Sequence, residues 1–209
     1  MSSFLLMSNH DILLMVINMS KVEVVPYNPV WKIEFEKAAQ AYSKLLRGLE
    51  VNIEHVGSTS IEGLWAKPIL DIDIIVPNSK VSQLVIERLE SVQYKHVGNQ
   101  GVKNREVLKY SKDNAFVTWM NHHLYVCIDN TENINNHLLL RQHLRQNREA
   151  VEAYSHLKRE LASRFPNDID AYIEGKTPLI TSFLEKEGMS QTSIERIRSI
   201  NKKEETKNN

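Results

Sequence analysis

The sequence predicts an α/β (α+β) protein in which helices flank a mixed sheet and the C-terminal third is helical. Apolar residues alternate with other residues along 69–76, which is typical of a strand. They recur every three or four positions along 29–47 and 80–92, which is typical of amphipathic helices. From residue 134 onward the pattern is helical only. Strands interleaved with helices and followed by a run of helices indicate one mixed sheet with a helical cap.

Turn residues separate the predicted elements. Asn28 and Pro29 favour a helix start, because asparagine caps helices and proline suits the first turn. Gly57 ends one strand, and Pro68 biases Lys67 toward extended backbone before the next strand. The first half is predicted to contain a strand at 21–27, a helix at 29–47, a strand at 51–56, a short turn or helix at 60–66, a strand at 69–76 and a helix at 80–92. The second half is predicted to contain two or three strands within 94–129, the best at His123–Ile128, and helices at 134–146, 149–165 and 168–186.

The two ends of the chain are expected to lie outside the main domain, which is predicted to span 19–187. Residues 1–18 are interpreted as an N-terminal extension with Met19 as the true start, and an extra helix or strand packed on the domain is the alternative. Residues 188–209 are polar and poorly patterned, so they are predicted to form a flexible tail.

Composition excludes several classes of function. The chain has 209 residues, a formal net charge of +0 and a pI of about 7.1, so no overall field attracts nucleic acid or an acidic membrane. Cys127 is the only cysteine, which excludes an intramolecular disulfide and a zinc site built on several thiolates. No run of 18 apolar residues predicts a membrane span. We therefore expect a cytoplasmic protein, and the sequence makes no prediction of oligomeric state.

The stretch from Gly57 to Asp73 has the layout of a metal-dependent phosphate site. Gly57-Ser58 forms a small-residue turn after a strand, and such a turn lets backbone N–H groups approach a polyphosphate. Asp71 and Asp73 alternate within an apolar strand, so both carboxylates project from one face, with Cα atoms roughly 6.6 Å apart. Carboxylates placed in this way can share Mg²⁺ with substrate phosphates. The alternative is that both aspartates end a strand and cap a loop.

The same stretch carries a family resemblance. Val56-Gly57-Ser58 is followed, after 12 residues, by Asp71-Ile72-Asp73, as in the nucleotidyltransferase (polymerase-beta-like) superfamily. The chain resembles the GrpB-like family of that superfamily over residues 22–186. The matching segments are VEVVPYNPVW (22–31), EHVGSTSIEGLWAKPILDIDI (54–74), HHLYV (122–126), LRQHLRQN (140–147) and YSHLKRELASRF (154–165).

The resemblance implies a nucleotidyltransferase-like fold and a nucleotide as the small-molecule partner. It places Gly57 and Ser58 at the phosphates of a nucleoside triphosphate, and Asp71 and Asp73 at magnesium. In such enzymes an acceptor hydroxyl attacks the α-phosphate and expels pyrophosphate.

The chain also departs from the superfamily pattern, which usually includes a third carboxylate on a later strand. Here the best candidate strand offers His123 and Tyr125 on the equivalent face, and family relatives commonly have a second histidine where Tyr125 stands. Glu106 or Asp129 could substitute for the missing acid from a neighbouring strand.

Several further residues are candidates for nucleotide binding, each with a structural alternative. Lys67 lies between the turn and the acids and could neutralise a triphosphate, or it could be a surface lysine. His55 could contact a phosphate or orient the turn, or it could be a structural histidine. The remaining candidates are Thr59 in the turn, Arg105 in the middle block, and Arg141, Arg145 and Lys158 in the C-terminal helices, where cations usually form a solvated face.

Three functions remain open at this point. The leading hypothesis is Mg²⁺-dependent transfer of a nucleotidyl group to an unknown acceptor hydroxyl. The alternative is a catalytically degenerate module that binds a nucleotide or a coenzyme A precursor, which the missing third acid favours. A third possibility is a protein-binding function of the C-terminal helices and tail.

Overall fold

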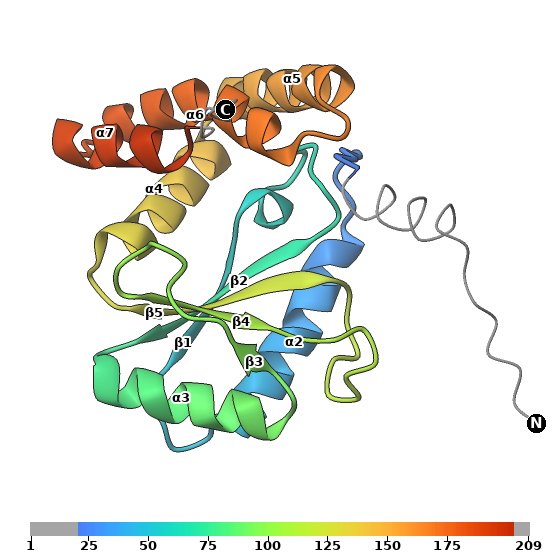
Figure 1. Cartoon of the computed structure of the whole chain (residues 1–209). Coiled ribbons are helices and arrows are strands. Elements are labelled where there is room, and N and C mark those ends of the chain that lie inside the picture. The colour runs from blue at the N-terminus through green and yellow to red at the C-terminus, as the bar shows by residue number, and fades with distance from the viewer. Residues whose placement is uncertain (1–20, 203–209) are drawn as a thin grey trace, which may run out of the picture.

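The computed structural model describes residues 21–202, and these residues form a five-stranded mixed sheet with six α-helices around it (Figure 1). The strand order is β1-β2-β5-β4-β3, with β2 and β5 parallel and the other pairs antiparallel. The strands are β1 (Asn52–Val56), β2 (Leu70–Val76), β3 (Lys95–His96), β4 (Arg105–Lys109) and β5 (His122–Ile128). The predicted α/β class with a mixed sheet is therefore confirmed.

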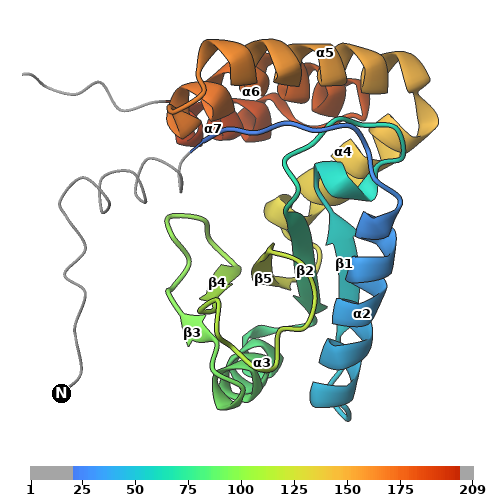
Figure 2. The same ribbon diagram turned by 90° about the vertical axis from the view of Figure 1, so that its right-hand side faces the viewer.

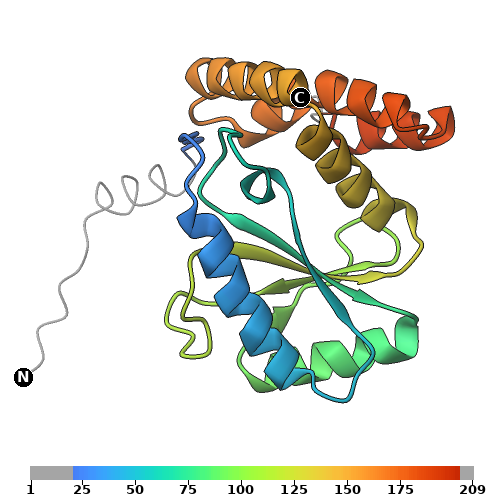
Figure 3. The same ribbon diagram turned by 180° about the vertical axis from the view of Figure 1, so that it is seen from behind.

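Two helices cover one face of the sheet, and four C-terminal helices form a cap. Helix α2 (Val30–Leu45) runs along the sheet in Figure 3, and α3 (Ser79–Ser91) lies near its lower edge. The cap consists of α4 (Glu132–Gln146), α5 (Arg148–Arg164), α6 (Ile169–Lys186) and α7 (Gln191–Ile200). Figure 2 shows α5, α6 and α7 as a layer across the end of the sheet at which β2 begins. No helix within 21–202 has both the length and the apolar content needed to cross a membrane.

The alternation of β2 divides its residues between two environments. Leu70, Ile72 and Ile74 are fully buried in the main core with the inner faces of α2 and α3. Asp71 and Asp73 project to the opposite face, where Ile75 packs with Ile134 of α4. The sequence pattern predicted this division, and it directs both acids toward the cap rather than into the apolar core.

A buried histidine at the start of β5 links α2 to the segment that precedes β3. His122 Nε2 lies 2.9 Å from the Tyr42 hydroxyl and 2.8 Å from the Tyr94 hydroxyl. The indole Nε1–H of Trp119 donates to His122 Nδ1 at 3.1 Å. This donation makes Nδ1 an acceptor, so the neutral ring carries its proton on Nε2. Burial lowers the pKa of His122 to about 4.

The structure corrects two predicted elements. Residues 21–27 do not form a strand, because only Val25 bridges Ala66 and Pro26 cannot donate to a ladder. The turn or helix expected within 60–66 is a turn at 61–64, and it follows a 3₁₀ turn, η1 (Ser58–Ser60), that includes the predicted phosphate-binding serine. Residues 191–200, predicted to be part of a flexible tail, form helix α7 with Ile194 fully buried. The predicted extension at 1–18, the start at Met19 and the last seven residues of the predicted tail lie outside the described residues.

Candidate functional site

The register of the sheet assembles the predicted acidic face. Parallel pairing places Asp71 opposite His123 and Asp73 opposite Tyr125. Antiparallel pairing with β1 places Glu54 opposite Asp73 on the same face. The two positions proposed for the third catalytic group, His123 and Tyr125, therefore do lie beside the acid pair, but neither is a carboxylate.

Each aspartate has a histidine partner. Asp71 Oδ1 lies 3.0 Å from His123 Nδ1, and Asp73 Oδ2 lies 2.7 Å from His137 Nδ1. Burial disfavours ionisation of Asp71, but the hydrogen bond and charge of His123 outweigh it and lower the pKa of Asp71. Burial likewise opposes charge on His137, and the neighbouring Asp73 reverses this effect and raises the pKa of His137. The Asp71 carboxylate and the His137 ring therefore both favour their charged forms.

His137 was not predicted from the sequence. It belongs to α4, and its partner Asp73 is 64 residues away along the chain. The α4 segment has weak helical amphipathicity, so its pattern does not indicate which side chains face the sheet.

Position 57 requires a glycine because the Asp71 side chain lies where a Cβ atom would be. Its φ of +67° is a conformation that L-residues with a side chain rarely adopt. A Cβ atom built on Gly57 would lie 2.1 Å from Asp71 Oδ2, which is far closer than van der Waals contact. The turn backbone and the first acid are therefore in direct contact, as the phosphate-site hypothesis requires.

A cavity of about 290 Å³ opens beside this contact, and three lysines line it. We call it the lysine cavity; its lining residues are Ser58, Lys67, Ile69, Asp71, His123, Lys158, Ile169, Tyr172, Ile173 and Lys176. Lys158 is only 2% exposed, and its Nζ has no hydrogen-bond partner among the described residues. The Tyr172 hydroxyl is also buried and unpartnered there. Buried donors without acceptors are costly, so this cavity is built to receive an acceptor-rich ligand.

The electrostatics of the lysine cavity reflect crowding of its cations. Burial and the charge of Lys176 lower the pKa of Lys158 well below its ordinary value, and Asp71 only partly opposes this. Burial lowers the pKa of Lys176 to about 8. Burial also lowers the pKa of Lys67. An anion in the cavity would favour the protonated form of all three lysines. Lys176 was not predicted, because only the packing of α6 against α5 places it there.

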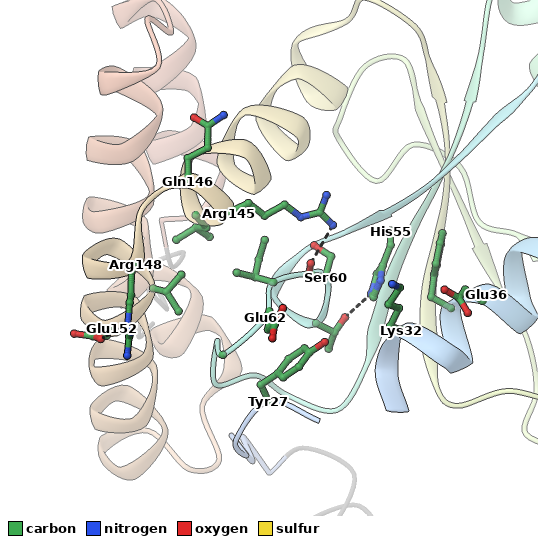
Figure 4. A pocket seen from close by; sticks show the side chains of 16 residues that line it. Tyr27, Lys32, Glu36, His55, Ser60, Glu62, Arg145, Gln146, Arg148 and Glu152 are labelled. Atoms are coloured by element: carbon green, nitrogen blue, oxygen red, sulfur yellow. Dashed lines mark hydrogen bonds and ion pairs between the residues drawn. The ribbon is translucent and has the colours of Figure 1, made fainter. Parts of the chain in front are cut away.

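A larger pocket of about 1050 Å³ lies on the other side of η1, and we call it the lateral pocket (Figure 4). Three residues predicted to bind phosphates, His55, Thr59 and Arg145, line this pocket rather than the lysine cavity. His55 Nε2 lies 3.0 Å from Thr59 Oγ1, and Arg145 Nη2 donates to the Ser60 carbonyl at 3.1 Å. His55, Thr59 and Arg145 therefore lie at a different cavity from Ser58, Lys67 and Lys158, and the η1 turn forms a wall of both cavities.

Two predicted cations line neither cavity. Arg141 Nη1 donates to Glu54 Oε2 and to the His55 carbonyl, both at 2.7 Å, and so holds α4 against β1. The Arg105 guanidinium lies over the ring of Tyr125, 4.9 Å from its centre. Both side chains support the acidic face instead of extending into a cavity.

The family model described as "GrpB protein" matches residues 21–186. The chain belongs to the GrpB family. It is 30% identical to the Glutamate-rich protein GrpB of Alkalihalophilus pseudofirmus over 169 residues, which cover 80% of this chain and 97% of that protein. It is 32% identical to the UPF0157 protein YqkA of Bacillus subtilis over 157 residues, which cover 75% of this chain but only 44% of YqkA. The family predicted from the sequence is thus confirmed.

Two solved structures are similar to this GrpB-family chain. The conserved protein GrpB from Enterococcus faecalis has a TM-score of 0.67 and 32% sequence identity, and the match covers 80% of this chain and all of that one. The Cid1 poly(U) polymerase with MgGTP bound has a TM-score of 0.49 and 16% identity, and the match covers 73% of this chain and 47% of that one.

The structure excludes both substitutes predicted for the third carboxylate. Glu106 pairs with Val126, so it lies on the opposite face of the sheet, and its Oε2 contacts His96 Nε2 at 2.6 Å. Asp129 follows the far end of β5, six positions beyond His123, which corresponds to about 20 Å along the strand. Glu54 is on the correct face, but Arg141 holds it in an ion pair. Within 21–202 no group of three or more histidine, cysteine, aspartate or glutamate residues forms a metal site.

The acid pair nevertheless suits magnesium that is shared with a substrate. Asp73 Oδ1 is buried and has no hydrogen-bond partner among residues 21–202, so it is an available oxygen ligand. Asp71 is partly exposed and borders the lysine cavity. Magnesium is commonly bound by one or two carboxylates together with substrate phosphates. The donor types therefore fit Mg²⁺, provided that a phosphate supplies the remaining ligands.

Proposed function

We propose that this GrpB-family protein binds a nucleoside triphosphate together with Mg²⁺ and transfers its nucleotidyl group to an acceptor hydroxyl. One observation carries the proposal: the buried Lys158 amine has no hydrogen-bond partner among the described residues and lines a cavity bordered by Ser58 and Asp71. Such a cavity matches a polyphosphate, which offers many acceptor oxygens and strong negative charge. With a single cysteine and no apolar run long enough to span a membrane in the sequence, we propose that this occurs in the cytoplasm.

The residues of the candidate site would have separate roles in binding phosphate, holding Mg²⁺ and positioning the carboxylates. Lys67, Lys158 and Lys176 would neutralise the terminal phosphates that leave as pyrophosphate. Ser58 and the adjacent backbone would hold the phosphate next to the acids. Asp71 and Asp73 would hold Mg²⁺, which, when bound, supplies Lewis-acid polarisation of the α-phosphate. His123 would keep the Asp71 carboxylate ionised and oriented, and His137 would orient the Asp73 carboxylate.

Thermal unfolding tests the binding step. Each of the four nucleoside triphosphates is added at millimolar concentration with and without Mg²⁺. At a concentration of about 100 Kd, a ligand selective for the folded state stabilises it by about 2.7 kcal/mol, or about 5 °C or more for a chain of this size. Asp71→Asn should abolish the gain from Mg²⁺, whereas the exposed Asp170→Asn should keep it. An unchanged midpoint with all four nucleotides would contradict the proposal.

A degenerate binding module is the second candidate, and a specific observation favours it. No third carboxylate lies free beside Asp71 and Asp73 among the described residues, since Glu54 is paired with Arg141. In this case the cavity would hold a nucleotide or a coenzyme A precursor without chemistry. Release of pyrophosphate from a bound triphosphate in the presence of hydroxyl acceptors supports transfer. Tight binding with no pyrophosphate release supports the binding module.

A further inference from the structure

The lateral pocket has the features of a ligand site that is separate from the lysine cavity. Its walls come from the start of α2, from β1 and η1, and from the junction of α4 and α5. Its volume of about 1050 Å³ is suited to a small organic molecule. Figure 4 shows Arg145 extending from α4 toward Ser60, while Lys32 comes from α2 beside His55.

Arg145 lines this pocket without an ion-pair partner among the described residues. Its guanidinium donates to the neutral Ser60 carbonyl, and no carboxylate of residues 21–202 lies within 4 Å of it. Burial and the neighbouring charge of Arg141 both disfavour the charged form and lower the pKa of Arg145, and the charge of Glu54 opposes them only in part. An anionic group that reached Arg145 would relieve both effects and form charge-assisted hydrogen bonds. Lys32, across the pocket, has no partner in the described part of the chain either.

The rings of Tyr27, Phe35 and His55 also line the lateral pocket. Phe35 and His55 stack with ring centres 4.6 Å apart and planes 13° apart. Burial lowers the pKa of His55 to about 4, so this ring is uncharged at neutral pH. The Tyr27 ring also lines the pocket (Figure 4). Planar apolar surfaces of this kind favour a ligand that contains a ring.

The balance of charge in the pocket excludes a polyphosphate. The basic and acidic side chains are equal in number, and Arg148 is already paired with Glu152 at 3.2 Å. Glu36 and Glu62 would repel a ligand with several negative charges. The lysine cavity differs, since it has three lysines and one acid. A ligand with one negative charge is therefore the better match for the lateral pocket.

We propose that the lateral pocket binds a small aromatic molecule with a single anionic group, held by Arg145 and stacked against the wall formed by Tyr27, Phe35 and His55. Because η1 forms one wall of each cavity, this ligand would occupy the opposite side of the turn from any phosphate bound at Ser58. The proposal does not depend on the proposed transfer activity.

Calorimetric titration of the full chain with 4-hydroxybenzoate tests this site. The matched probes are phenol, which has the ring without the charge, and acetate, which has the charge without the ring. We expect saturable binding of 4-hydroxybenzoate at millimolar concentration or below, and binding about tenfold weaker or worse for both matched probes.

The variants Arg145→Gln and Arg47→Gln separate the site from a general charge effect. Arg145→Gln should weaken 4-hydroxybenzoate binding by about tenfold or more, whereas Arg47→Gln, which removes the charge of an exposed arginine outside the pocket, should change it less than about twofold. Changes in the amide resonances of Thr59 and Ser60 on titration would report the location. Absence of saturable binding, equal losses in both variants, or resonance changes confined to residues elsewhere would overturn the proposal.

Discussion

At the scale of single residues, Gly57 and Asp71 are fitted to one another. The glycine adopts a positive φ, and its missing side chain leaves the space that the Asp71 carboxylate occupies. We expect Gly57→Ala to lower the free energy of unfolding by about 3 kcal/mol or more, because backbone strain and overpacking add together. It should also displace Asp71 and remove any Mg²⁺-dependent binding of nucleotide.

Gly63→Ala is the matched control for this prediction. Gly63 also has a positive φ, of +79°, but a Cβ there would meet nothing within 4 Å. Its substitution should cost only the strain of the left-handed conformation, about 1–2 kcal/mol. Urea unfolding of both variants measures the difference. If the two variants lose equal stability, Gly57 and Asp71 are not fitted together as the structure indicates.

The buried Lys158 amine lowers the stability of the folded chain, and we expect it to form part of an anion-binding site. A buried amine that has no hydrogen-bond partner and contacts only the Tyr154 ring, 5.0 Å from its centre, disfavours the folded state at neutral pH, because the unfolded chain binds a proton that the folded chain holds poorly. We therefore expect Lys158→Met to raise the unfolding midpoint by about 2 to 6 °C and to abolish binding of tripolyphosphate. Thermal scans with and without tripolyphosphate check both effects.

Lys186→Met, at an exposed position in the last turn of α6, is the control and should change neither quantity appreciably. A Lys158→Met variant that is less stable than the wild type would show that the amine has a structural partner. Retained binding of tripolyphosphate in that variant would show that the anion lies elsewhere.

At the scale of secondary-structure elements, α7 depends on one residue. Ile194 is the buried residue of this helix, while Arg198 donates to Thr181 of α6 at 3.3 Å. Ile194→Ala should destabilise the cap by about 2–5 kcal/mol or release α7 from α6. The exposed Ile200→Ala should change stability by less than about 0.5 kcal/mol. Hydrogen exchange of the α7 amides distinguishes the variants, and equal protection in both would contradict this view of the helix.

The elements that were predicted correctly are those whose apolar pattern extends over several residues. The strands at 51–56 and 69–76 and the helix at 29–47 agree with β1, β2 and α2 to within two residues at each end. Helix α7 was missed although Ile194, Ile197 and Ile200 recur at helical spacing, because the residues between them are polar and the segment was taken for a tail. The 21–27 segment alternates like a strand, but in the structure it makes only the bridge between Val25 and Ala66.

At the scale of the whole molecule, the candidate site forms where the sheet meets the cap. The turn, Asp71 and Asp73 were predictable because they are close in sequence and their chemistry is local. His137 and Lys176 were not, because only the folding of the cap over the sheet brings them to the acids. The sequence likewise does not specify on which side of the η1 turn the side chains of His55, Thr59 and Arg145 lie. Tertiary packing determines that side, and it also determines which residues of the cap reach the acids.

Two buried neutral histidines make the whole fold sensitive to acid. Burial lowers the pKa of His55 and that of His122 to about 4, against an ordinary value of 6.5. Below pH 6.5 the unfolded chain therefore binds protons that the folded chain does not, and stability falls as pH decreases toward 4. The loss should amount to about 3 kcal/mol for each histidine. His137 acts in the opposite direction, because its raised pKa contributes stability that is present below pH 6.5 and lost above the folded-state value.

Urea unfolding at several pH values between 7 and 4.5 measures this dependence, and His122→Phe isolates one contributor. The variant should be less stable at pH 7, because it removes the shared partner of the Tyr42 and Tyr94 hydroxyls. Its loss of stability between pH 6.5 and 4.5 should nevertheless be smaller than that of the wild type by about half, since of the two histidines whose pKa burial lowers among residues 21–202 it retains His55. His156→Gln changes an exposed histidine and should retain the wild-type slope. A His122→Phe variant with the wild-type slope would mean that His122 binds its proton equally well in the folded and unfolded states, contrary to its hydrogen bond from Trp119.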